Sequence, residues 1–275
     1  MKTLLSMGLI LCLAISMTGC CFVPIAQHPT ETIPVYPAET IPTYPTEPSI
    51  SIPTTEETLL PTEPEHSALY IPNVSTEEII TYFEEVALSM EYTTGSGDVS
   101  LVQKWVQPIR YRIDGNPTPE DIAILNGLLD ALNRIDGFPG IYAAQELPPE
   151  DLTIRFLDLD SFNLAFSETV HGEIADGAVQ FWYYTDTNEI YNGRIGCRTD
   201  ISQQVRNSVI LEEVINCLGF NDTTLREDSI LYQYSSDNTQ LSNIDWVLIQ
   251  LLYHPDMRCG MNAYQCREVI RKLYY

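Results

Sequence analysis

The chain has 275 residues, with 38 aspartates and glutamates against 14 lysines and arginines and a formal net charge of −24. A chain this acidic repels the phosphates of nucleic acids and anionic lipid surfaces, which excludes nucleic-acid binding as its function. It is long enough for one sizeable hydrophobic core in addition to non-globular segments.

Residues 1–19 have the pattern of a secretory signal peptide. Lys2 precedes an apolar run, Leu4 to Met17, that is too short to span a bilayer as a stable helix. The run ends in Met17-Thr18-Gly19-Cys20, which resembles the lipobox of bacterial lipoproteins, with methionine where leucine is usual. We therefore expect Cys20 to be lipidated and to anchor the protein outside the bacterial cell membrane. The alternative is ordinary secretion without a lipid.

Residues 20–68 have the composition of a linker. Proline, threonine, glutamate and serine dominate, and too few apolar residues are present to form a core. An octapeptide is nearly repeated, at Glu31–Ala38 and Glu39–Thr46. Repeated prolines favour extended polyproline II segments, so this stalk could reach on the order of 100 Å. The alternative interpretation is a proline-rich ligand for a partner domain.

One globular domain is predicted over residues 69–275, because no second linker follows. Its first helix follows Ser75, and Glu78 stands at the capping-box position. The remaining elements are a strand at 105–113, a helix at 117–135, strands at 152–157, 178–185 and 189–198, and helices at 203–218, 241–252 and 263–273. This order predicts an α+β domain with a small mixed sheet and an N-terminal helix pair.

The helix predicted at 203–218 leads into a polar motif. The segment Glu212–Asp222 has the frame H-E-x-x-H-x-L-G-x-x-H, with its glycine in register, and resembles a zincin motif whose histidines have been replaced. In that motif two histidines at i and i+4 hold zinc, and the glutamate between them activates water. The resemblance places Glu212 and Asn216 at the two histidine positions. Glu213 then corresponds to the general base and Asp222 to the third metal ligand.

The downstream chain extends this resemblance over about residues 105–275. Ser229–Tyr232 is similar to the turn below the metal in zincins, and Leu251–Pro255 with Gly260-Met261 is similar to their closing segment. The implied fold is zincin-like, with a degenerate active-site helix. More narrowly, the chain resembles an uncharacterised bacterial family called domain of unknown function 2927, whose corresponding helix also begins with paired glutamates.

Metal binding at this motif cannot follow the zincin pattern, because only His171 and His254 are present in the predicted domain. The oxygen set of Glu212, Asn216 and Asp222 suits calcium, magnesium or manganese better than zinc. We expect no cofactor, with such a divalent metal as the alternative. A His171–Glu213 acid–base pair is a further alternative.

The cysteines of the predicted domain suggest disulfides, which form readily outside the cytoplasm. Cys259 with Cys266, or Cys197 with Cys217, are plausible pairs, and the spacing alone does not fix the connectivity.

These patterns predict a catalytically degenerate, metalloprotease-like binding or scaffolding domain. Its expected partners are the membrane, through the lipid, and an envelope protein or an extended peptide held along an edge strand. Trp182, Tyr183 and Tyr184 are candidate residues of the peptide cleft. The alternatives are an active metal-dependent hydrolase that uses Glu213 as its base, and a purely structural envelope protein.

Overall fold

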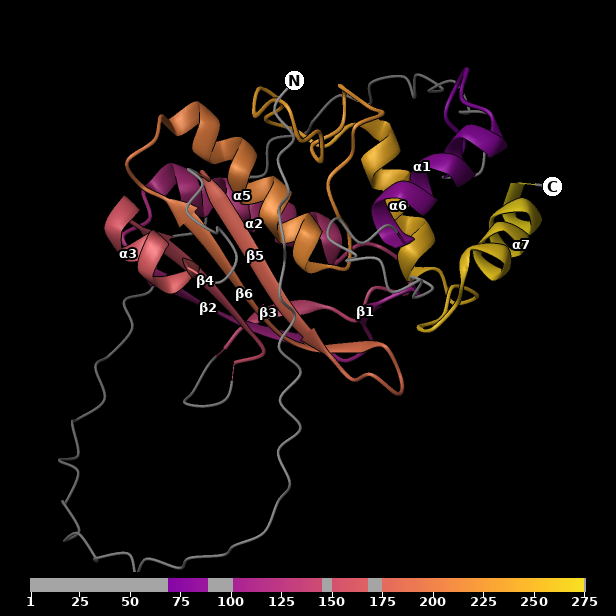
Figure 1. The fold of residues 1–275 in the computed structure, drawn as a ribbon, viewed down its shortest axis with the longest axis horizontal. Coiled ribbons are helices and arrows are strands. Elements are labelled where there is room, and N and C mark those ends of the chain that lie inside the picture. The colour runs from indigo at the N-terminus through magenta and orange to yellow at the C-terminus, as the bar shows by residue number, and fades with distance from the viewer. Residues whose placement is uncertain (1–68, 89–100, 145–149, 168–174, 275) are drawn as a thin grey trace, which may run out of the picture. The chain divides into compact units, whose positions relative to one another are not determined.

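The computed structural model describes residues 69–88, 101–144, 150–167 and 175–274 (Figure 1). The signal peptide, Cys20, the stalk and His171 lie outside these residues, so the expectations for them stay predictions. No helix in the described ranges is both long enough and apolar enough to cross a membrane.

Among the described residues, six strands form one mixed sheet. They are β1 (Lys104–Trp105), β2 (Ile109–Gly115), β3 (Ile141–Ala143), β4 (Leu152–Leu157), β5 (Gly177–Tyr183) and β6 (Glu189–Arg198). The strand order is β1-β6-β4-β2-β3, and β5 pairs with β6 off this path. The β5–β6 pair is antiparallel and the other pairs are parallel. Strand β5 therefore lies at an edge of the sheet.

Two groups of helices pack together in the described ranges. The helices are α1 (Thr76–Leu88), α2 (Pro119–Leu132), α3 (Leu159–Ala165), α5 (Gln203–Cys217), α6 (Asn243–Tyr253) and α7 (Ala263–Tyr274). Helices α2 and α5 pack together, and α5 also packs on β5 and β6, as Figure 1 shows. Helix α1 packs against α6 and α7.

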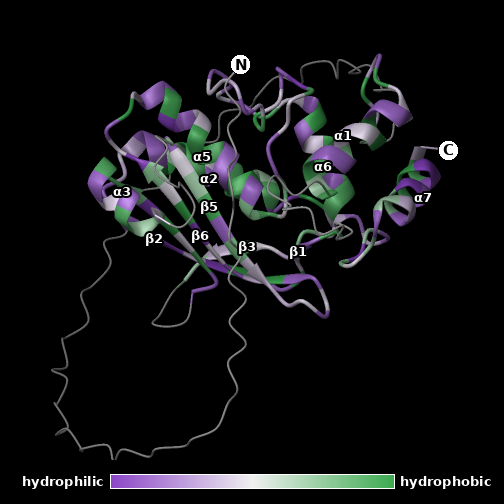
Figure 2. Ribbon diagram, viewed as in Figure 1, coloured by the Kyte–Doolittle hydropathy of each residue, from purple (hydrophilic) through white to green (hydrophobic). Residues whose placement is uncertain are grey.

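Local sequence explains where these helices begin. The Thr118 side chain accepts from the backbone N–H of Asp121, and the Asp121 carboxylate accepts from that of Thr118, so a full capping box starts α2. Ser75 and Glu78 form the predicted capping interactions at the start of α1. Purple and green residues occur together within the helices in Figure 2, as expected for helices with one buried face.

The predicted mixed sheet is confirmed, but the expected α+β class needs correction. Most strand pairs are parallel, and parallel neighbours need crossover connections such as α2 between β2 and β3, which makes the fold a mixed α/β arrangement. The expected N-terminal helix pair is also divided, because α1 packs with α6 and α7 while α2 packs with α5.

The strand predicted at 105–113 is broken into β1 and β2. Pro108 lies in the break, and proline has no N–H to donate to a neighbouring strand. Strand β3 and helix α3 were not predicted. Strand β6 has the predicted bounds, and α5 ends one residue earlier than expected.

The expected disulfides are not formed, since the four described cysteines are free. Cys217 points at Gly193 of β6, where an added Cβ would lie 2.7 Å from its Sγ. The Cys259 thiol instead contacts the carbonyl of Lys104, and Cys266 is buried in the core. Packing, rather than pairing, therefore places these side chains.

Candidate functional site

Helix α5 carries three of the four predicted site residues in its second half. It begins at Ser202, whose side chain accepts a hydrogen bond from the backbone N–H of Val205. Glu213 is 8 % exposed and Asn216 is 7 % exposed, whereas Glu212 is half-buried. The acidic motif is therefore partly enclosed by protein rather than lying on a solvated helix face.

Glu213 lies against the first residue of the edge strand. A Cβ added to Gly177 would come within 2.4 Å of Glu213 Oε1 and 2.5 Å of Val209 Cγ1. Only glycine allows helix and strand to approach this closely. The general-base position of the motif thus adjoins the start of β5.

Gly219 turns the chain at the end of α5. Its φ is +112°, and an added Cβ would lie 2.1 Å from the carbonyl oxygen of Gln103. A side chain here would be strained by the backbone conformation and by the contact. The glycine in the motif is therefore a requirement of the fold, and it brings the following residues back beside α5.

Asn216 and Asp222 meet as a result of this turn. Asn216 Nδ2 donates to Asp222 Oδ1 at 2.9 Å. Burial raises the pKa of the half-buried Asp222 carboxyl, and the bond from Asn216 opposes this shift. The other atom of the same amide, Asn216 Oδ1, is buried and has no hydrogen-bond partner in the described part of the chain. A buried acceptor left in this state costs about 1–3 kcal/mol.

The segment around Asp222 is held by helix α1. The backbone N–H of Asn221 donates to the carbonyl of Val86 at 2.7 Å, and that of Thr224 donates to Glu85 Oε1 at 2.9 Å. Helix α1 therefore holds the chain on both sides of Asp222, and Asn216 of α5 holds the Asp222 side chain.

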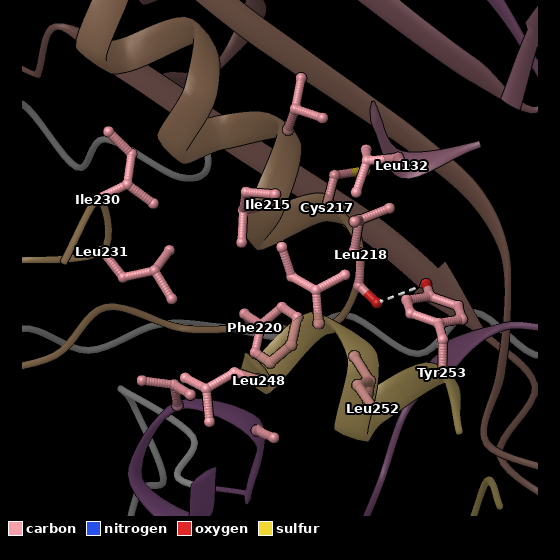
Figure 3. Close-up of a cluster of buried hydrophobic side chains, with 14 of the residues drawn as sticks. Leu132, Ile215, Cys217, Leu218, Phe220, Ile230, Leu231, Leu248, Leu252 and Tyr253 are labelled. Carbon is pink, nitrogen blue, oxygen red and sulfur yellow. Dashed lines mark hydrogen bonds between the residues drawn. The ribbon is translucent and has the colours of Figure 1, made fainter. Parts of the chain in front are cut away.

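The turn Ser229–Tyr232 pairs with this segment at Thr223 and carries a buried polar network. Tyr82 Oη donates to Ser229 Oγ at 2.6 Å, and Ser229 Oγ donates to Asp245 Oδ1 at 2.6 Å. Burial raises the pKa of Asp245 even though the carboxylate accepts several hydrogen bonds, and burial also raises the pKa of Tyr82. Ile230 and Leu231 of this turn lie in the hydrophobic cluster of Figure 3.

The closing segment holds the end of α5. Tyr253 Oη donates to the carbonyl of Leu218 at 3.1 Å, as the dashed line in Figure 3 shows. His254 follows as the C-cap of α6, and its Nδ1 accepts from the backbone N–H of Asp256 at 3.1 Å. His254 therefore has a local structural role and does not reach the motif through these contacts.

The described residues do not fit a zinc ion at this motif. Asn216 and Asp222 are hydrogen-bonded to each other, and the described ranges hold no group of three histidine, cysteine or acidic side chains arranged to bind a metal. Amide and carboxylate oxygens are also poorer zinc ligands than histidine nitrogen or thiolate sulfur.

Of the three candidate cleft aromatics, Trp182 and Tyr183 end β5, and Tyr184 is the first residue after it. Tyr183 is half-buried and packs against the main core, whereas Trp182 and Tyr184 are 40 % and 52 % exposed. Trp182 lies over the Arg194 guanidinium, and Tyr184 stacks on Tyr191 with ring centroids 4.5 Å apart. Their alternation follows the two-residue period of a strand.

Sequence reasoning missed the roles of Gly177 and of the network from Tyr82 to Asp245. The hydrogen-bonding partners in that network are 147 and 16 residues apart, so no local pattern indicates them. The sequence contains the capping signal Ser242-x-x-Asp245, but this signal does not indicate that Asp245 also accepts a hydrogen bond from Ser229.

A family model described as protein of unknown function (DUF2927) matches residues 76–272. The chain belongs to this family. The match begins at the first residue of α1 and extends into α7, so the DUF2927 region includes the sheet, α5 and Asp222. No curated protein matches the chain.

Proposed function

We propose that this DUF2927 protein is a lipid-anchored, extracytoplasmic binding domain, built on a zincin-like fold that has lost zinc hydrolysis. Its ligand is an extended peptide that pairs with the outer edge of β5. The anchor is Cys20, and the stalk at residues 20–68 holds the domain away from the membrane.

The observation that carries the loss of zinc chemistry is the 2.9 Å hydrogen bond between Asn216 and Asp222. Two positions that hold metal in a zincin motif instead bind one another here. A metal ion would have to replace this bond and would still lack a nitrogen ligand, since zinc sites depend on histidine or cysteine.

Peptide binding is supported by the edge strand beside α5. Strand β5 pairs with β6 along one side, and no strand in the described ranges pairs along the other. An open edge offers backbone donors and acceptors at the spacing of an extended peptide. The contact of Glu213 with Gly177 places the motif alongside this edge.

The alternative is a metal-dependent hydrolase with Glu213 as general base and Glu212 and Asp222 as carboxylate ligands. It would need a hard cation with further oxygen ligands, such as calcium, magnesium or manganese. Asn216 Oδ1 is the observation in its favour, because an unpaired buried oxygen is a possible ligand.

One experiment separates these functions. The full chain, purified in neutral detergent, is dialysed against trace zinc, manganese, magnesium and calcium and analysed for bound metal. It is then incubated with a mixed library of blocked peptides that is followed by mass spectrometry. We expect no stoichiometric metal and no new peptide termini.

The matched variant is Glu213→Gln, which removes the base but keeps the shape of the side chain. Stoichiometric metal together with cleavage that this variant abolishes would establish the hydrolase and refute the proposal. Peptide capture without cleavage, by both the unaltered chain and the variant, supports the binding domain.

A further inference from the structure

The unpaired oxygen of Asn216 indicates what the site lacks. Asn216 is 7 % exposed, and its amide is held by the bond from Nδ2 to Asp222. Turning the amide over would place Oδ1 against a carboxylate oxygen of Asp222. Since buried polar atoms in native proteins are nearly always paired, this acceptor calls for a donor from outside the described residues.

Asp222 lies beside this acceptor and supplies a charge. Its one hydrogen-bond partner in the described ranges is the neutral amide of Asn216. A carboxyl group in its ionised form attracts a nearby cation. A carboxylate and an unpaired amide oxygen together offer two hydrogen-bond acceptors to a cationic donor.

We propose that Asn216 and Asp222 recognise a primary ammonium group, as on a lysine side chain of the bound peptide. This inference rests on the proposed peptide-binding function and gives that function a ligand class.

The geometry favours an ammonium over the other cations. A hard divalent metal needs six or more oxygen ligands, whereas an ammonium carries three donors and matches a few acceptors. A guanidinium prefers to form two parallel bonds to a carboxylate. Oδ1 of Asp222 already accepts a hydrogen bond from Asn216, which hinders such a pair of parallel bonds.

The location is consistent with a peptide on β5. Asn216 follows Glu213 by three residues, which is about 4.5 Å further along the helix axis. Glu213 adjoins Gly177 at the start of β5, and Cys217 adjoins Gly193, which is paired with Phe181. Helix α5 therefore passes from the start of β5 toward the Gly193–Phe181 pair of β6 and β5, with Asn216 in its last turn.

The test compares two blocked peptides, acetyl-Thr-Val-Thr-Lys-Thr-Val-Thr-amide and the same peptide with norleucine in place of lysine. Norleucine keeps most of the aliphatic chain and removes the charge. Isothermal titration calorimetry with the full chain in neutral detergent is expected to show about tenfold tighter binding of the lysine peptide.

Three variants test whether the preference for the lysine peptide depends on Asp222 and Asn216. Asp222→Asn removes the charge, and Asn216→Leu removes the acceptor with little change in volume. Both should lose the lysine preference while still binding the norleucine peptide. Asp186→Asn, in the exposed turn between β5 and β6, changes the net charge equally and should keep the preference. Circular dichroism verifies the fold of each variant.

The outcomes separate this inference from the proposed function. Equal binding of both peptides, or a lysine preference that persists in Asp222→Asn and Asn216→Leu, overturns the ammonium site and leaves peptide binding intact. Binding of neither peptide refutes both. Stoichiometric binding of magnesium or calcium that displaces the lysine peptide would show that the site takes a metal instead.

Discussion

Two carboxylates in this domain have pKa values raised by burial but differ in their hydrogen bonds. Asp245 accepts from Ser229 Oγ, from the backbone N–H of Ile230, and from both the N–H and the hydroxyl of Ser242. Asp222 accepts from Asn216 alone within the described ranges, and that same amide has an unpaired oxygen.

The difference agrees with the proposal that Asp245 serves the fold and Asp222 serves a ligand. A satisfied buried network fixes the elements that it joins, here α1, the Ser229–Tyr232 turn and α6. An incompletely paired polar group is tolerated where function requires it. We therefore expect Asp245 to act in the structure and Asp222 in the proposed binding site.

The largest expected effect is that of Asp245→Ala. The substitution leaves several buried donors without an acceptor and should lower the free energy of unfolding by about 4 kcal/mol. Asp222→Ala, the matched change, should lower it by about 1 kcal/mol, because only the hydrogen bond from Asn216 is lost. Denaturant titrations followed by circular dichroism measure both values. Equal losses at the two positions would contradict the division of roles.

Gly219→Ala should be the next most destabilising change. The positive φ and the approach to Gln103 should together lower the free energy of unfolding by about 3 kcal/mol. Gly127→Ala is the control, because an added Cβ in this part of α2 meets nothing within 4 Å. The control should stabilise by about 0.5–1 kcal/mol, as expected within a helix. A tolerated Gly219→Ala would mean that the turn presenting Asp222 is not fixed as described.

Tyr82→Phe tests the satisfied network with a smaller change. Only the hydroxyl that donates to Ser229 is lost, so the free energy of unfolding should fall by about 1 kcal/mol. In thermal unfolding, the variant should lie between the unaltered chain and Asp245→Ala. A variant as stable as the unaltered chain would show that the hydroxyl does not contribute.

The pH dependence gives the finest comparison. The pKa of Asp222 is raised above its ordinary value of 3.8. The contribution of Asp222 to stability is therefore present below pH 3.8 and is lost as pH rises through the raised pKa. For Asp151 burial is outweighed by hydrogen bonds from Arg110, which lower its pKa. The Asp151 contribution is therefore present above 3.8 and is lost as pH falls.

We expect the stability difference between the unaltered chain and each asparagine variant to change with pH, in opposite directions for the two variants, between about pH 3 and pH 7. The stability of the unaltered chain relative to Asp222→Asn should fall as pH rises. Its stability relative to Asp151→Asn should rise over the same range. Urea titrations at each pH give both differences, and slopes of the same sign would contradict the assigned environments.

The long elements of the fold could be predicted because their apolar residues recur at the period of a helix or of a strand. Residues 189–198 and the helix 203–217 combine apolar spacing with clear ends, such as the Ser202 cap. Strand β3 has three residues, too few to show a period, and pairs with β2 only through tertiary structure. Helix α3 has a local signal, since the Asp158 side chain accepts from the backbone N–H of Ser161.

The candidate site was predictable as a motif but not as a set of contacts. The resemblance to the zincin motif implied that Asn216 and Asp222 would lie close together, as two of its metal-ligand positions. The direction of Glu213 toward Gly177 depends on how α5 packs on β5, which no local pattern specifies. The expected disulfides were wrong because the spacing of cysteines does not determine the direction in which their side chains pack.

The central claim is that the domain binds an extended peptide on β5 without cleaving it. Hydrogen–deuterium exchange of the full chain, with and without the lysine peptide, tests this claim directly when the intact mass of the peptide is measured in the same sample. We predict slower exchange in residues 177–183 and an unchanged peptide mass. Unchanged exchange in β5, or a peptide cut during the incubation, would contradict the account.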